Sequence, residues 1–139
     1  AIRSEQIAQM YDDFEAMGHH ITYKWVDKKV QVKKPYRENA EQNVNIAKTM
    51  LGSSAMADVL IFFQDENLAG ALDEKGAFSL SAVKDSPGRK LFIVEDNYQR
   101  QSIFDSLEFV EIVSDTQKIY GDLGRIASLS SLTPITTQN

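Results

Sequence analysis

The chain has 139 residues, contains no cysteine and carries a net charge of −5 with a pI of about 5.0. Its length fits one domain, and 42% hydrophobic residues with 25% charged residues are typical of a globular protein. The lack of cysteine excludes disulfides, zinc–thiolate sites and a cysteine nucleophile. The acidic balance argues against nucleic-acid binding, and no apolar run has the roughly 20 residues of a membrane helix. We therefore expect a cytoplasmic protein with neither nucleic-acid nor membrane partners.

Helical and extended patterns alternate along the chain. They predict helices at 4–17, 36–54, 73–83 and 116–129, and strands at 20–25, 58–63, 90–94 and 108–113. The runs DVLIFF at 58–63 and KLFIV at 90–94 are continuously apolar, which suits parallel strands covered on both faces. This order predicts an α/β fold with a doubly wound parallel sheet, a flavodoxin-like or Rossmann-like three-layer sandwich. Residues 1–129 would form the domain, and the Ser- and Thr-rich residues 130–139 a flexible C-terminal tail.

The beginning of the chain departs from this architecture. Such folds usually begin with a strand, whereas this chain opens directly with a helix. We therefore expect that the first strand is missing from the chain and that the N-terminus is incomplete.

Open parallel sheets bind ligands outside the carboxyl ends of their strands, and this rule selects the segment 63–76 as the most informative. Glu74 falls near the predicted start of a helix, where the helix dipole favours a negative charge and keeps a carboxylate ionised. An ionised and positioned carboxylate can act as a nucleophile. The alternative is that Asp73 and Glu74 only complement the helix start, as acidic residues often do.

Four further residues are candidates for substrate binding. Gly70 permits a tight turn out of the loop. Gly76 lies inside the helix, where glycine costs about 1 kcal/mol relative to alanine, and this indicates close approach of a neighbouring backbone or a ligand. Trp25 ends a strand and could stack on a base, or could equally be a core or rim residue. Asp65 lies in the loop of the same segment.

Cofactor and metal motifs are missing from the sequence. Neither a G-x-x-x-x-G-K-[ST] nor a G-x-G-x-x-G phosphate loop is present. The adjacent histidines at 19 and 20 form no metal-ligand pattern with nearby carboxylates. We expect no cofactor and no metal.

Several short motifs in a fixed order resemble the nucleoside 2-deoxyribosyltransferase family, which includes deoxynucleoside 5′-monophosphate N-glycosidases. They are ADVLIFF at 57–63, GALDEKG at 70–76, GRKLFIV at 88–94 and IF at 103–104, together with IR at 2–3, EAMGHHIT at 15–22 and Trp25. The resemblance covers Ile2 to Tyr120. It implies that the missing first strand would be central to the sheet, so that its absence would expose a large apolar cleft.

The resemblance also implies a mechanism and its residues. Glu74 matches the catalytic glutamate, which attacks the anomeric carbon of a deoxyribose and forms a covalent intermediate. Arg3 matches an arginine that would bind phosphate. The implied ligand is a deoxynucleoside or its 5′-monophosphate, and the implied assembly is a homo-oligomer.

Two positions differ from the family pattern. Met50 stands where members carry an aspartate that helps to hold the substrate, and Leu72 replaces a small residue two positions before the glutamate. Two alternatives therefore stay open. One is a catalytically silent nucleotide-binding domain, and the other is an unrelated TIR-like or flavodoxin-like interaction domain.

Overall fold

The structure is a computed structural model that describes residues 3–24, 26, 32–64, 69–95, 102–129 and 136–138. Its strands form one parallel sheet in the order β1-β5-β2-β3-β4. The strands are β1 (His20–Ile21), β2 (Val59–Phe63), β3 (Lys90–Val94), β4 (Val110–Val113) and β5 (Thr136–Gln138). The protein is therefore an α/β protein with a parallel sheet, consistent with a Rossmann-like fold in general.

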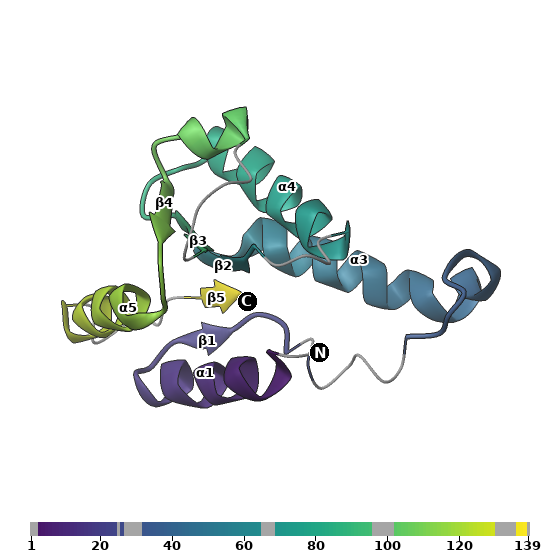
Figure 1. Ribbon diagram of the computed structural model, residues 1–139, viewed down its shortest axis with the longest axis horizontal. Coiled ribbons are helices and arrows are strands. Elements are labelled where there is room, and N and C mark those ends of the chain that lie inside the picture. The colour runs from purple at the N-terminus through teal and green to yellow at the C-terminus, as the bar shows by residue number, and fades with distance from the viewer. Residues whose placement is uncertain are drawn as a thin grey trace.

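Helices cover both faces of the sheet (Figure 1). On one face lie α1 (Ser4–Ala16) and α5 (Gln117–Leu129), and on the other lie α3 (Ala40–Met56) and α4 (Ala69–Lys84). Two short 3-10 helices, η2 (Arg37–Asn39) and η3 (Ile103–Ser106), precede α3 and β4. The strand predicted at 108–113 is present as β4, which ends the sheet.

The two faces of β2 contribute to two separate apolar cores. Val59 and Ile61 pack in the core under α1 and α5, whereas Leu60 and Phe62 pack in the core under α4. Successive side chains of a strand point to opposite faces, so a strand that is buried on both faces must be apolar throughout. This confirms the interpretation of the DVLIFF run.

The predicted third helix begins earlier than its sequence pattern indicated. It starts at Ala69 rather than at Asp73, because Ala69, Ala71 and Leu72 are good helix formers that extend the helix backwards in spite of Gly70. Gly70 therefore lies in the first turn of α4 and not in a turn before it. Glu74 is the sixth residue of the helix, so its predicted place at the helix start is wrong.

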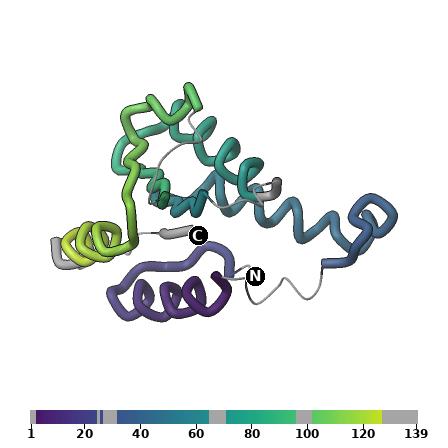
Figure 2. The backbone as a smooth tube through the Cα atoms, viewed as in Figure 1, coloured from purple at the N-terminus to yellow at the C-terminus, as the bar shows by residue number. Residues whose placement is uncertain are grey.

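Most of α3 is exposed. Its apolar residues Val44 and Leu51 are both 42% exposed. Figure 2 shows the N-terminal half of this helix extending away from the sheet. Among the residues of α3, all of which the structure describes, only Ser54 is buried. The apolar spacing correctly predicted a helix, but it did not predict what the helix packs against.

The most informative difference concerns β5. Its residues pair in parallel with β1 at His20 and Ile21 and with β2 at Val59 and Leu60. Residues 136–138 are thus a central strand, and the prediction of a flexible tail is wrong for them. The resemblance implies a first strand in this central position. The structure has β5 there, so a strand is present where an open cleft was expected. The strand could not be predicted from its Ser- and Thr-rich sequence, because central strands are usually apolar.

Among the described residues, no helix is long and apolar enough to cross a membrane.

Candidate functional site at the carboxyl edge of the sheet

Polar side chains gather where the parallel strands end. Gln64 follows β2 and donates from Nε2 to Oε2 of Glu95, which follows β3, at 2.8 Å. Arg3 lies at the start of α1, and its guanidinium stacks 4.5 Å from the ring centre of Phe63, the last residue of β2. The guanidinium also donates to Gln6 Oε1 at 3.0 Å. This edge is where open parallel sheets bind ligands.

Glu74 is partly buried and points toward α3. The hydroxyl of Ser54, which is fully buried, donates to Glu74 Oε2 at 3.4 Å. Burial raises the pKa of Glu74 to about 7; the hydrogen bond from Ser54 opposes this shift, and the charge of Asp73 adds to it. The prediction that the helix dipole keeps Glu74 ionised is therefore wrong. The helix dipole acts mainly within the first turn, and Glu74 lies beyond that turn. Loss of solvent therefore has the largest effect on its pKa.

Tyr23 is the third member of this group. It follows β1 on the same edge of the sheet. Burial raises the pKa of its phenol, and the negative charge of Glu74 raises it further. Ser54 thus contacts Glu74 through a hydrogen bond, and Tyr23 interacts with its charge.

The next residue of α4 contrasts with Glu74. Lys75 is buried and forms an ion pair with Asp105 at 2.6 Å, with 9% and 5% of the two side chains exposed. Its ammonium also lies 5.1 Å from the ring centre of Phe62. Asp105 belongs to η3, where it also accepts from the backbone N–H of Ser102. This ion pair links α4 to η3.

The other predicted site residues have different positions. Arg3 lies at the carboxyl edge, as described. Gly70 is in the helix, and a Cβ at Gly76 would meet nothing within 4 Å, so no neighbouring backbone requires glycine there. Trp25 and Asp65 lie outside the described residues.

Sequence reasoning missed Ser54 and Tyr23. The sequence pattern places Ser54 only at the end of the predicted helix 36–54 and Tyr23 only in the predicted strand 20–25. A buried serine near the end of an otherwise exposed helix has no local signature, because its partner Glu74 is 20 residues away in the sequence.

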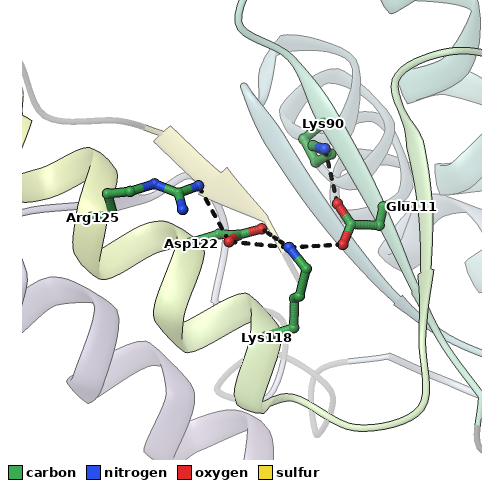
Figure 3. A network of polar contacts seen from close by, with 5 residues as sticks. All are labelled: Lys90, Glu111, Lys118, Asp122 and Arg125. Carbon is green, nitrogen blue, oxygen red and sulfur yellow. Dashed lines mark hydrogen bonds and ion pairs between the residues drawn. The ribbon is translucent and has the colours of Figure 1, made fainter.

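A second polar region lies at the opposite edge, where β2 and β3 begin. A cavity of about 250 Å³ there is lined in part by Val59, Lys90, Asp122 and Arg125, and not by Glu74. Lys118 lies 3.1 Å from Glu111 and 3.0 Å from Asp122, and each carboxylate has a second cationic partner, Lys90 or Arg125 (Figure 3). Burial would raise the pKa of Glu111, but hydrogen bonds from Lys90 and Lys118 outweigh it and lower that pKa.

Within the described parts of the chain, no group of three or more histidine, aspartate or glutamate side chains could hold a metal ion. Comparisons with known proteins add no assignment, since no protein-family model, no characterised protein and no solved structure matches this chain.

Proposed function

We propose that this protein cleaves or transfers the N-glycosidic bond of 2′-deoxynucleosides or their 5′-monophosphates, with Glu74 as the nucleophile. The observation that carries the proposal is the state of Glu74. It is a carboxylate with a pKa of about 7, without an ion-pair partner among the described residues, in the helix α4 that follows the carboxyl end of β2. Buried structural carboxylates are usually paired with a cation, and none of the described cationic side chains pairs with this one.

The chemistry follows from a carboxylate in this position. One oxygen of ionised Glu74 forms a bond to C1′ of the deoxyribose, while the bond from C1′ to the base nitrogen breaks. The base leaves with the electron pair of that bond and takes up a proton from solvent water. Water, or a second base, then attacks C1′, releases the sugar and restores the carboxylate. A pKa near 7 leaves about half of the side chains ionised at neutral pH, which is enough for attack.

The substrate's phosphate and the assembly state follow from other parts of the structure. Arg3, at the carboxyl edge of the sheet, suits a 5′-phosphate, because its planar guanidinium matches phosphate oxygens. Exposed apolar side chains on α3 and α4 offer a surface for the self-association that the resemblance implies. They are Val44, Leu51, Met56, Leu72, Leu80 and Val83. The helices on both faces of the sheet support a doubly wound, flavodoxin-like sandwich.

A base-release assay tests the proposal. The parent, Glu74→Gln and Asp73→Asn are incubated with deoxynucleosides and their 5′-monophosphates, and free base is followed by chromatography. We expect release by the parent, near-parental release by the exposed neighbour variant Asp73→Asn, and a loss of roughly a thousandfold or more in Glu74→Gln. Release that survives Glu74→Gln, or a folded parent that releases no base, would refute the proposal.

A nucleotide-binding domain without chemistry is the second candidate, and Met50 favours it. Met50 lies one helical turn before Ser54 on the same face of α3, so a thioether stands where the resemblance expects a carboxylate. Binding of a deoxynucleotide with no base release would support this candidate over the enzyme. The same incubations, followed by calorimetric titration, separate the two.

A further inference from the structure

Ser54 is unusual for its position. Its helix is exposed along most of its length, yet Ser54 itself is 0% exposed. Buried hydroxyl groups are normally satisfied by hydrogen bonds, since an unpaired one costs free energy. The hydroxyl of Ser54 has a side-chain partner on another helix, Glu74 Oε2.

This hydrogen bond distinguishes the two oxygens of the carboxylate. Oε2 accepts from Ser54, whereas Oε1 accepts no hydrogen bond from any residue that the structure describes. A nucleophilic carboxylate needs this asymmetry, because one oxygen must be held while the other attacks. The distance of 3.4 Å is long for such a bond. Hydrogen bonds of this kind are often loose before the substrate binds and tighten when it does.

We propose that Ser54 is a positioning residue for Glu74, which holds Oε2, leaves Oε1 to attack and favours the ionised carboxylate. This inference rests on the proposed function and deepens it. The hydroxyl can donate to the ionised carboxylate, and a donor to the charged form stabilises that form. It acts against the burial that raises the pKa of Glu74.

The other groups around Glu74 do not supply this stabilisation. Asp73, on the same helix, carries a like charge that raises the pKa of Glu74. Tyr23, from the segment after β1, is a neutral phenol below its own raised pKa. Of the groups that face Glu74 in the described structure, Ser54 is therefore the one that lowers its pKa.

The test compares Ser54→Ala with Ser53→Ala. Both serines lie on α3, and alanine suits a helix, so neither change should unfold the chain. Base release is measured as kcat/KM from pH 5 to 9. In Ser54→Ala the acid limb should move upward by about half a unit to one unit, so the loss of activity is several-fold at pH 6 and small at pH 8. Ser53→Ala should keep the parental profile. A uniform loss at all pH values, or an unchanged acid limb, would overturn the inference.

A second readout does not depend on activity. NMR titration of the carboxyl carbon of Glu74, assigned with Glu74→Gln, gives its pKa in the parent and in both serine variants. An upward shift in Ser54→Ala alone supports the positioning role, even if no substrate is cleaved and the proposed function fails. An unchanged pKa in Ser54→Ala overturns the role, even if the parent releases base.

Discussion

The carboxylates in two regions of the molecule differ in their ion-pair partners. At the amino edge, Glu111 and Asp122 each contact two cations (Figure 3). In α4, Glu74 accepts a hydrogen bond from the hydroxyl of Ser54 and has no ion-pair partner among the described residues. The pKa of Glu111 is lowered, whereas that of Glu74 is raised to about 7. A carboxylate that is paired with cations links the helices and strands that carry them. A partly buried carboxylate without such a pair destabilises the fold and is available for chemistry.

The same contrast occurs within α4, between the adjacent residues Glu74 and Lys75. Lys75→Met should lower the free energy of unfolding by about 3 kcal/mol, because it leaves Asp105 buried without its cation. Urea denaturation monitored by circular dichroism measures this change. The double variant Lys75→Met, Asp105→Asn should recover much of the loss, since neither charge is then left alone. If Lys75→Met proves as stable as the parent, the ion pair of Lys75 with Asp105 does not stabilise the fold, and its contrast with Glu74 is contradicted.

The unpaired carboxylate should give a distinct pH dependence of stability. In the folded protein Glu74 has a pKa of about 7, whereas a glutamate in an unfolded chain has a pKa of about 4.5. Between these values the folded chain keeps a proton that the unfolded chain has released, so the free energy of unfolding falls as the pH rises. The fall attributable to Glu74 should be on the order of 2 kcal/mol after allowance for partial exposure, and it should be absent in Glu74→Gln. Urea midpoints at pH 4.5, 6 and 8 test this, and parallel curves for the two proteins would contradict it.

The smallest effect is expected at the amino edge. Lys118 is 55% exposed and contacts both Glu111 and Asp122. Exposed ion pairs contribute little and are screened by salt, so Lys118→Met should shift the thermal unfolding midpoint only slightly. The shift should shrink further in 1 M NaCl. A large shift that persists in high salt would show that this network contributes more to stability than exposed ion pairs normally do.

Sequence periodicity predicted the local elements well. The helix at α1 and the strand at β3 begin where the patterns indicated, and the apolar run of β2 correctly predicted a strand that is buried on both faces. These features depend on neighbouring residues, since helical and strand spacing is a local property. Glu74 could be selected for the same reason, because the end of a strand and the following helix are both visible in the sequence.

Contacts between distant segments were decided only by the tertiary structure. The strand β5 is too short and polar to be recognised, and it exists as a strand because β1 and β2 offer it unpaired backbone groups on both sides. The pKa of Glu74 likewise depends on burial and on Ser54, which is 20 residues away. The sequence by itself determined the long helices and the strands other than β5, and it placed Glu74 in the helix that follows β2. The protonation state of that residue and the centre of the sheet were decided by packing, because desolvation and strand pairing are non-local.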